Sequence, residues 1–352
     1  MSKPITLVRV SQSRLTEEVR EKSVFGTAFS DHMLFAQYHN GGWCEPQIVP
    51  YGPIPLAPSI SALHYGQSLF EGFKAHRIPD DGVALFRPRD NFVRLNRSAK
   101  RLAMPEVPES IFIEGIAELV RVDRDWVPHK DGGALYARPV YFAVDEALVV
   151  RPAQNYCFIV FTSPVGDYFG EPLKLVVEEQ YVRAFPGGTG DIKPAGNYGG
   201  SLLASCRAQE QGFHNVIWLD GLERRLVEES GLMNIFFVID SAAVTPALSG
   251  TILPGVVRDS VLVLLREMGI KTVERPIPID EVFGAHAKGI LTEAFAVGTA
   301  ATVAPIERIR YREKDIQFPL GLQGSVAIKV RQRLVAIRTG HEPDKHEWLM
   351  PV

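Results

Sequence analysis

A glycine-rich stretch that ends in a lysine is the most unusual chemical feature of this sequence. Gly187, Gly188 and Gly190 precede Lys193 in the run GGTGDIK at residues 187–193. Glycines this dense permit backbone conformations that other residues resist. Three interpretations compete: a phosphate-binding loop of the nucleotide-hydrolase type, a dinucleotide-binding fingerprint, and a lysine on a tight loop before a helix.

The flanking residues exclude the first two interpretations. A nucleotide-hydrolase loop needs Gly before the lysine and Ser or Thr after it, whereas Ile192 and Pro194 occupy these places. A dinucleotide fingerprint needs a third glycine where Lys193 stands. A lysine on a tight loop remains, and by itself it is compatible with a solvated surface residue, because most lysines have no chemical role.

The context of Lys193 is more informative than the lysine itself. The run YVRAFPGGTGDIKPAGNY at residues 181–198 resembles, almost letter for letter, the cofactor-lysine segment of the branched-chain aminotransferases. Other segments resemble the same family in the family's order: LHYGQSLFEGFKA at 63–75, LYARP at 135–139, ESGLMN at 229–234, ILPGV at 252–256 and GTA at 298–300. The resemblance extends from about residue 25 to residue 319. Because several motifs in order are more specific than any one, the sequence is identified as a member of this class IV, pyridoxal-phosphate-dependent family.

The resemblance implies a set of residues that bind pyridoxal 5′-phosphate. Lys193 is expected to form a Schiff base with the cofactor and to transfer a proton. Glu229 matches the carboxylate that keeps the pyridine nitrogen protonated, since a nearby negative charge favours the charged form. Its neighbour Glu228 would point to the other side of a strand, and we expect a surface charge there. The further cofactor contacts are implied for Arg94, Tyr198, Leu253, Gly255, Val256, Val257 and Thr299, of which Arg94 and the amides of Val256, Val257 and Thr299 match the phosphate cup.

The resemblance also implies a pocket for two kinds of substrate. Phe25, Tyr65, Phe70 and Tyr136 match the apolar wall, and Thr299 and Ala300 match further substrate contacts. Arg138 matches the arginine that reaches the distal carboxylate of glutamate; the alternative is an arginine that stabilises the small domain through a surface ion pair. The expected reaction exchanges the amino group between leucine, isoleucine or valine and 2-oxoglutarate, which gives branched-chain 2-oxo acids and glutamate. The expected active unit is at least a homodimer.

The sequence departs from the family pattern at a few positions, and other functions are less compatible with its motifs. Val257 and Leu232 stand where members often have threonine, and ATVA at 301–304 lacks the CxxC of some members, which excludes a thiol switch there. D-amino-acid transaminases and aminodeoxychorismate lyases share the fold and the lysine but lack the LYxRP and HYGQ segments. A non-catalytic phosphate-ligand-binding protein would have lost Lys193 or Glu229, and both are present. No histidine spacing indicates a metal site, and no GxSxG run indicates a serine hydrolase.

Apolar spacing predicts a mixed α and β chain of two domains. Short aromatic and β-branched runs with turn residues between them predict hairpins at 33–43 and around 83–87. Helices are predicted at 91–104, 111–122, 200–211, 256–268 and 279–286, and further strands at 135–142, 156–163, 174–178, 215–219 and 234–239. Long strands that are partly joined by turns favour a folded-over sheet in the second half rather than a regular doubly wound one. The family resemblance implies a barrel-like sheet there.

These elements lead to expected domain boundaries. We expect a small N-terminal α/β domain at 1–166, a connecting loop at 167–180, and a larger C-terminal domain at 181–352 that carries the cofactor lysine. The resemblance implies the type IV fold of pyridoxal-phosphate enzymes, like that of D-amino-acid aminotransferase. Residues 1–20 mix charges without an apolar core, and we expect an exposed arm rather than a secretory signal.

Composition excludes several classes of partner. Hydrophobic residues make up 46% and charged residues 22%, with 38 Lys+Arg against 41 Asp+Glu. This balance is typical of a soluble globular protein, so nucleic acid is not an expected partner. No apolar run reaches the roughly 18 residues of a membrane span. The 3 cysteines form no CxxC pair, so we expect no disulfide framework and a cytoplasmic location.

Overall fold

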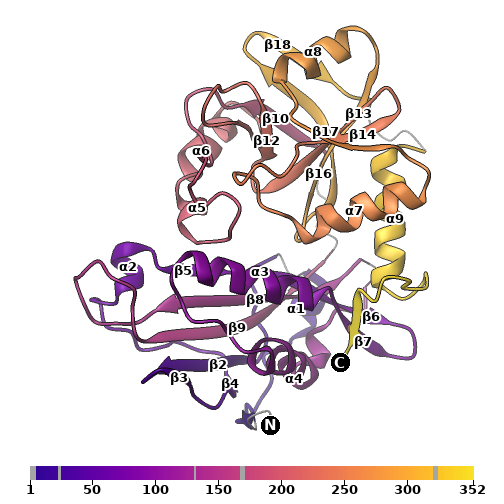
Figure 1. The fold of residues 1–352 in the computed structure, drawn as a ribbon. Helices are drawn as coiled ribbons and strands as arrows, with labels where there is room; N and C mark the ends of the chain where they lie inside the picture. The colour runs from indigo at the N-terminus through magenta and orange to yellow at the C-terminus, as the bar shows by residue number, and fades with distance from the viewer. Residues whose placement is uncertain (1–4, 23–24, 131, 167–170, 320–323) are drawn as a thin grey trace. The chain divides into compact units, whose positions relative to one another are not determined.

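The computed structural model describes residues 5–22, 25–130, 132–166, 171–319 and 324–352. Contacts within the chain divide it into two compact units, and each is described by itself (Figure 1). None of the helices in these residues is long and apolar enough to span a membrane. The same residues contain no group of three or more His, Cys, Asp or Glu side chains arranged to hold a metal ion.

The two units differ from the predicted domains in several segments. The first unit is built from Met1–Tyr168, Lys193–Ala195 and Ala336–Val352, and the second from Phe169–Ile192 and Gly196–Val335. Residues 336–352, which we expected in the C-terminal domain, therefore belong to the first unit. The reason is a long-range pairing, since the C-terminal strand pairs with a strand of the first sheet. The strand predicted at 174–178 is present as β10 (Leu173–Val177), and it lies within the segment predicted as the connecting loop.

A ten-stranded, largely antiparallel sheet forms the framework of the first unit. Its order is β1-β4-β2-β9-β8-β6-β7-β19, while β3 pairs with β2 and β5 pairs with β8 (Figure 1). The strands are β1 (Thr6–Leu7), β2 (His32–His39), β3 (Gly42–Trp43), β4 (Gln47–Pro50), β5 (Ser68–Phe70), β6 (Phe73–Ile78), β7 (Gly82–Phe86), β8 (Ala134–Ala143), β9 (Tyr156–Val165) and β19 (Leu349–Pro351). The long β8 and β9 are paired along their whole length.

The predicted hairpins of the first unit are confirmed, and their turns have the conformation that the sequence favours. Asn40 and Gly41, between β2 and β3, have φ of 52° and 78°. Asp80 and Asp81, between β6 and β7, have φ of 58° and 54°. Two successive residues with positive φ form a turn whose twist matches that of the strands, and Asn, Asp and Gly adopt this conformation most readily.

Helices cover the sheet of the first unit and complete its core. They are α1 (Glu17–Lys22), α2 (Ser61–Tyr65), α3 (Pro88–Arg101), η1 (Ser110–Glu114), α4 (Gly115–Val122) and η2 (Arg124–Trp126). Helix α3 begins with Pro88, whose fixed φ suits a first helical position. Its Leu95 and Ala99 are fully buried in one apolar cluster with Phe112 and Phe158. The predicted helices at 91–104 and 111–122 are therefore confirmed in position and in buried face.

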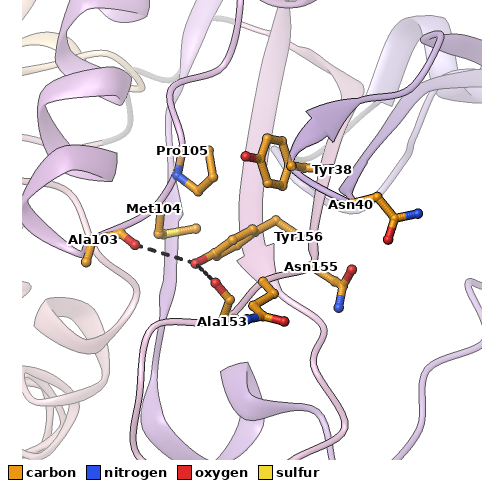
Figure 2. A pocket seen from close by; sticks show the side chains of 10 residues that line it. Tyr38, Asn40, Ala103, Met104, Pro105, Ala153, Asn155 and Tyr156 are labelled. Carbon is orange, nitrogen blue, oxygen red and sulfur yellow. Dashed lines mark hydrogen bonds between the residues drawn. The ribbon is translucent and has the colours of Figure 1, made fainter.

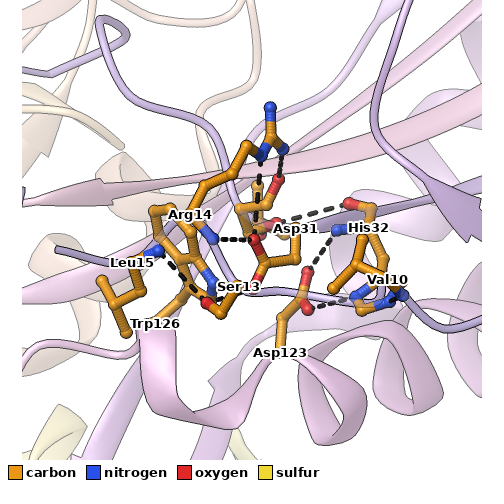
Figure 3. A network of polar contacts seen from close by, with 10 residues as sticks. Val10, Ser13, Arg14, Leu15, Asp31, His32, Asp123 and Trp126 are labelled. Atoms are coloured by element: carbon orange, nitrogen blue, oxygen red, sulfur yellow. Dashed lines mark hydrogen bonds and ion pairs between the residues drawn. The ribbon is translucent and has the colours of Figure 1, made fainter.

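The N-terminal segment is exposed along most of its described residues, as expected of an arm, but it is anchored to the first unit. Strand β1 pairs in parallel with β4. The Val10 amide donates to Nε2 of His32 (3.0 Å), whose Nδ1 lies 2.6 Å from Asp123 Oδ1 (Figure 3). Ser13 Oγ and the Arg14 amide donate to the Asp31 carboxylate at 2.6 and 2.8 Å. Ser13 and Arg14 belong to the polar and charged residues that suggested a solvated arm. In the structure they bind the buried Asp31.

A closed barrel forms the framework of the second unit, as predicted. Strands β12, β11, β10, β17, β16 and β13 pair in this order, and β12 also pairs with β13, which closes the ring (Figure 1). The strands are β10 (Leu173–Val177), β11 (Asn215–Leu219), β12 (Val227–Ser230), β13 (Met233–Ile239), β14 (Ala242–Thr245), β15 (Thr272–Glu274), β16 (Leu291–Gly298), β17 (Thr302–Tyr311) and β18 (Lys314–Gln317). Ile235, Phe237 and Ile309 belong to its buried apolar core.

Helices pack on the strands of this second unit. They are α5 (Gly196–Gly199), α6 (Leu202–Glu210), α7 (Val256–Glu267), α8 (Ile279–Ala287) and α9 (Val326–Arg338). Helices α7 and α8 both contact β16, and α6 contacts β11. The predicted helices at 200–211, 256–268 and 279–286 are confirmed, whereas α9 was not predicted.

Candidate active site

The main chain around Lys193 is paired with β5 of the first unit. The Phe70 amide donates to the carbonyl of Lys193 (3.2 Å), and the Ala195 amide donates to the carbonyl of Ser68 (3.0 Å). The side-chain amine, Nζ, lies 4.6 Å from the centroid of the Phe70 ring. Lys193 is half-buried. A loop lysine is thus held by strand pairing, in contrast to a freely solvated surface lysine.

Arg94 lies on α3 with its guanidinium oriented by a buried carboxylate. Its Nε and Nη2 donate to Glu71 Oε1 and Oε2 at 2.7 and 2.8 Å, and Nη2 also lies 3.2 Å from Asn91 Oδ1. Arg94 is 7% exposed and Glu71 is fully buried. A bidentate pair of this kind fixes the plane of the guanidinium. Glu71 was not predicted as a site residue, although it lies in the motif at residues 63–75.

Aromatic rings surround Arg138 on β8. Its Nη2 donates to the Tyr136 hydroxyl (3.1 Å), and its Cζ lies 4.8 Å from the Phe70 ring centroid. Phe25 packs edge to face on Tyr136 with centroids 4.9 Å apart. No carboxylate within the described ranges forms an ion pair with Arg138, and its Nε is buried without a hydrogen-bond partner. The alternative of an arginine in a surface ion pair is therefore wrong.

Tyr136 owes its position to a glycine on the neighbouring segment. A Cβ atom placed on Gly72 would lie 1.7 Å from the Tyr136 hydroxyl oxygen, so only glycine leaves room for this ring. Burial raises the pKa of Tyr136, while the nearby Arg138 acts in the opposite direction. The phenol therefore stays neutral at physiological pH and can donate or accept a hydrogen bond.

Tyr65 is the predicted pocket residue that the structure does not bring to the others. It ends α2, is 41% exposed, and its ring neighbours that of His64 at 6.1 Å. Among the described residues, no ring contact or hydrogen bond joins it to Phe25, Phe70 or Tyr136. Phe25, Phe70, Tyr136, Arg138 and Lys193, by contrast, lie together in the first unit.

In the second unit, Glu229 on β12 is buried between two donors. Its Oε2 lies 2.9 Å from Arg183 Nε, and its Oε1 accepts the Leu253 amide at 2.7 Å. Both side chains of the ion pair are nearly inaccessible, at 5% for Arg183 and 3% for Glu229. Breaking a buried pair by removing one partner costs about 3–5 kcal/mol, because it leaves a charge uncompensated. Arg183 belongs to the motif at 181–198 but was not predicted as a site residue.

The turn after Leu253 leads into the first turn of α7. Gly255 precedes the helix, and a Cβ placed on it would lie 2.1 Å from Oδ1 of Asn234, whose Nδ2 donates to the Leu253 carbonyl (3.0 Å). Val256 and Val257 are the first residues of α7. First-turn amides of a helix have no acceptor within the helix and favour an anion. Asn234, which shapes this turn, is a further residue that was not predicted from the sequence.

The remaining predicted residues lie on turns of the second unit. Thr299 and Ala300 form the turn between β16 and β17, next to Val297, which pairs with Asn234. Tyr198 lies in the short α5, half-buried, and its carbonyl accepts hydrogen bonds from Ser201. Thr299 and Ala300 are therefore near the turn that Asn234 shapes.

Glu228 is buried, so the expectation of a surface charge there is wrong. It is 4% exposed, and Thr251 Oγ1 donates to its Oε1 while Oε2 has no partner. Burial raises the pKa of Glu228. All four residues of β12 are buried, because both sides of this strand are covered. The alternation of side chains along a strand predicts that Glu228 and Glu229 point to opposite faces. It does not predict whether the second face is exposed to solvent, and here that face is covered.

A pocket of about 740 Å³ in the first unit contains none of the predicted site residues. It is lined by Tyr38, Asn40, Gly41, Ala103, Met104, Pro105, Ala153, Gln154, Asn155 and Tyr156. Figure 2 shows the Tyr156 hydroxyl between the carbonyls of Ala103 (3.5 Å) and Ala153 (2.6 Å). The lining residues carry no charged side chain, and we assign no chemistry to this pocket.

Each unit, taken by itself, contains groups that amine-transfer chemistry requires. The first unit has a half-buried amine at Lys193 and an oriented guanidinium at Arg94. The second has a buried carboxylate at Glu229 and the helix start at Val256. An amine can form a covalent link to a carbonyl, and a guanidinium and helix amides bind phosphate.

Known proteins resemble this chain over most of its length. The sequence model of the family described as amino-transferase class IV matches residues 68–309. Branched-chain-amino-acid aminotransferase 2 of Bacillus subtilis is 41% identical over 100% of this chain and 98% of its own length. The crystal structure of Escherichia coli branched-chain amino acid aminotransferase has a TM-score of 0.76 and 28% identity, and covers 91% of this chain and 98% of that one.

A further solved structure includes a bound compound. It is the T.th. branched-chain amino acid aminotransferase complexed with N-(5′-phosphopyridoxyl)-L-glutamate, with a TM-score of 0.71, 29% identity, and coverage of 90% of this chain and 97% of that one. The family match spans more than half of the chain, and the relative in Bacillus subtilis aligns with all of it. The chain therefore belongs to the class IV aminotransferases, in the family of the branched-chain-amino-acid aminotransferases.

Proposed function

We propose that this protein transfers amino groups between branched-chain L-amino acids and 2-oxoglutarate, with pyridoxal 5′-phosphate attached to Lys193. One observation carries the proposal: Phe70 has the Lys193 amine on its ring at 4.6 Å and the Arg138 guanidinium at 4.8 Å. A group for covalent chemistry thus lies near a cation that forms no ion pair with the described carboxylates. The aromatic surroundings suit an aliphatic side chain, and the cation suits a second carboxylate.

The residues of the second unit fit the cofactor. Gly255 leaves a space that a Cβ would fill, directly before the amides that start α7. The buried Glu229 suits the ring nitrogen, and the α7 amides suit a phosphate. In the first unit, the guanidinium of Arg94 also suits a phosphate. When bound, the cofactor supplies an aldehyde that exchanges amino groups and a ring that withdraws electrons.

The chain's own groups then have separate tasks. Lys193 Nζ would hold the cofactor and would move the proton at the substrate's α-carbon. The Glu229 carboxylate holds a proton on the ring nitrogen, and Arg183 and the Leu253 amide keep that carboxylate in place. Thr299 and Ala300 lie on a half-buried turn, and its amides suit the substrate's α-carboxylate.

Arg138 gives the pocket its ability to take both leucine and glutamate. Burying the distal carboxylate of glutamate without a partner would be costly. Arg138 is held by the Tyr136 hydroxyl and the Phe70 ring, neither of which neutralises its charge. The guanidinium is therefore available to an incoming carboxylate, while its aromatic neighbours accept a leucine side chain.

We also propose a homodimer that buries the apolar surface beside Tyr65. The exposed apolar side chains of α2 and of the loop at 145–150 are Leu63 (69%), Tyr65 (41%), Leu148 (67%), Val149 (59%) and Val150 (79%). The two segments are adjacent, because the Ser61 amide donates to the Asp145 carbonyl (2.9 Å). Contiguous exposed apolar side chains are typical of protein interfaces. Sedimentation analysis should show a dimer, and Val149→Asp should shift it to monomer; a monomeric wild type would contradict this.

Borohydride trapping followed by a donor panel tests the proposed activity. The protein loaded with pyridoxal phosphate is reduced, digested and mapped, and the label is expected on Lys193. Lys193→Ala should lose the label and turnover, while Lys74→Ala, at another buried lysine, should keep the label. Leucine, isoleucine, valine and glutamate should act as donors with 2-oxoglutarate. A label elsewhere, or activity with D-alanine but not with L-leucine, would overturn the proposal.

A further inference from the structure

A single buried hydroxyl connects the two residues that are proposed to hold the ends of the cofactor. Ser98 lies on α3, one helical turn after Arg94, and is fully buried. Its Oγ donates to the carbonyl of Arg94 (2.9 Å) and accepts the amide N–H of Lys193 (3.2 Å). The hydroxyl therefore acts as donor to one residue and acceptor from the other.

This contact complements the pairing of Lys193 with β5. The strand bonds fix the carbonyl of Lys193 and the amide of Ala195. The amide of Lys193 itself donates to Ser98 Oγ, which fixes the main chain on the other side of the carbon that bears the reactive side chain. Glu71 fixes the guanidinium of Arg94, which lies on α3. The Ser98 hydroxyl donates to the main-chain carbonyl of Arg94. The helix and the lysine segment are thus joined at one point.

We propose that Ser98 is a positioning residue that sets the spacing between Lys193 and Arg94, and so between the attachment points for the aldehyde and the phosphate of pyridoxal phosphate. The inference rests on the proposed function, which assigns these roles to the two residues. A ligand bound at two points gains affinity when the points are held at the right spacing in advance. A ligand bound at one point gains nothing from that spacing.

Serine suits this position because the site needs a small donor and acceptor. Alanine would leave the Lys193 amide without this acceptor, and buried amides without partners are rare and costly. A helix serine can bond to the carbonyl of residue i−4 in many proteins. The bond that the Ser98 hydroxyl donates to the Arg94 carbonyl would alone imply little. The additional bond that the Lys193 amide donates to Ser98 is what supports a positioning role.

The test compares a two-point ligand with a one-point ligand. The apoprotein is titrated with pyridoxal phosphate and, at millimolar concentration, with pyridoxal, which lacks the phosphate; binding is followed by absorbance. Ser98→Ala should weaken pyridoxal phosphate about 10-fold, the change that corresponds to one buried hydrogen bond of about 1.4 kcal/mol. The affinity for pyridoxal should change less than about 2-fold. Equal losses for the two ligands, or none, would overturn the proposal.

Ser30→Ala is the matched control. Ser30 lies in the same unit, is 1% exposed, donates from Oγ to the His32 carbonyl (3.3 Å) and accepts from Thr162 Oγ1 (2.5 Å). Its loss removes a comparable pair of hydrogen bonds with no link to Lys193 or Arg94. Thermal unfolding should show similar destabilisation in both variants, whereas only Ser98→Ala should separate the two ligands. The same weakening of pyridoxal phosphate in Ser30→Ala would contradict the inference.

A double-mutant cycle provides a second measurement and keeps the two proposals separate. In an Arg94→Met background the phosphate contact is already lost, so Ser98→Ala should then weaken pyridoxal phosphate no more than pyridoxal. If Ser98→Ala does not fold, Ser98→Cys, which keeps the size but bonds weakly, should give an intermediate loss. A wild-type protein that shows no borohydride label on Lys193 would overturn the proposed function; a labelled wild type without the ligand difference would overturn only the role of Ser98.

Discussion

Replacing Arg138 by methionine is expected to separate the two substrate classes of the enzyme. The Arg138 guanidinium contacts the Tyr136 hydroxyl at 3.1 Å and the Phe70 ring at 4.8 Å. Its Nε is buried without a partner. A carboxylate that pairs with it forms charged hydrogen bonds, and a charged partner left unpaired costs roughly 2–4 kcal/mol. Arg138→Met should therefore lower kcat/KM for glutamate and 2-oxoglutarate about 10²-fold.

Single half-reactions measure this effect without interference from the second substrate. The spectrum of the bound cofactor is followed after mixing with leucine alone or with glutamate alone. The leucine half-reaction should change less than about threefold, because the aliphatic side chain gains no charged contact from Arg138. Arg138→Lys should fall between the wild type and Arg138→Met for glutamate, since an ammonium keeps the charge but not the planar, two-pronged donor.

Arg77→Met controls for the general cost of removing an arginine from this sheet. Arg77 lies on β6 with a side chain 16% exposed, and it bonds to Asp81 and to the Val127 carbonyl. Its loss should affect stability without distinguishing the substrates. Equal losses for leucine and glutamate in Arg138→Met would show that Arg138 supports the fold and does not bind the substrate.

Three further predictions concern buried groups outside the substrate pocket. Burial raises the pKa of Glu228, so the folded protein retains a proton that the unfolded chain releases, and stability falls as pH rises above the ordinary carboxyl range. Glu228→Gln should raise Tm by about 2–4 °C at pH 8 and by less at pH 5; a lower Tm at pH 8 would contradict this. Burial also raises the pKa of Cys157 to about 12, whereas Cys206 is exposed. In the native protein a thiol reagent should react rapidly at Cys206, so Cys206→Ser should remove a fast phase that persists in Cys157→Ser. Finally, Gly255→Ala should weaken pyridoxal phosphate binding about tenfold, since its Cβ would lie 2.1 Å from Asn234 Oδ1. Gly284→Ala, with nothing within 4 Å of its Cβ, should bind normally, and equal affinity in both variants would refute the expected clash.

Local elements of the fold could be predicted from the sequence because their signals are local. The turn at Asn40 and Gly41 and the apolar face of α3 depend on residues within a few positions of each other. The pairing of β19 with β7 and of β10 with β17 joins segments that lie far apart in the sequence, so their match is decided by the whole fold. The N-terminal segment shows the same limit. Its charged residues predict a solvated arm, but its partners Asp31 and His32 are buried residues of a separate segment.

Motifs in the sequence point to candidate site residues, whereas the contacts that support these residues could not be predicted. Lys193, Glu229 and Arg94 stand in motifs that resemble the family. Glu71 and Arg183, which orient them, lie in the same motifs but carry no sign of their partners in the sequence. An ion pair between residues 23 or 46 positions apart follows only from the paired strands and helices that bring them together. Ser98 and Asn234 were missed for the same reason.

Glu228 and Glu229 show why burial alone does not decide which carboxylate has a chemical role. They are neighbours on β12 and have similar exposure, 4% and 2%. Glu228 accepts a hydrogen bond from a neutral hydroxyl on Thr251, and burial raises its pKa. Glu229 accepts from the Arg183 guanidinium and from the Leu253 amide. Cationic and amide donors favour the charged form of a carboxylate, whereas desolvation favours the neutral form. A carboxylate that holds a proton on a cofactor nitrogen must carry the negative charge itself, which is why we assign that role to Glu229 and not to its equally buried neighbour.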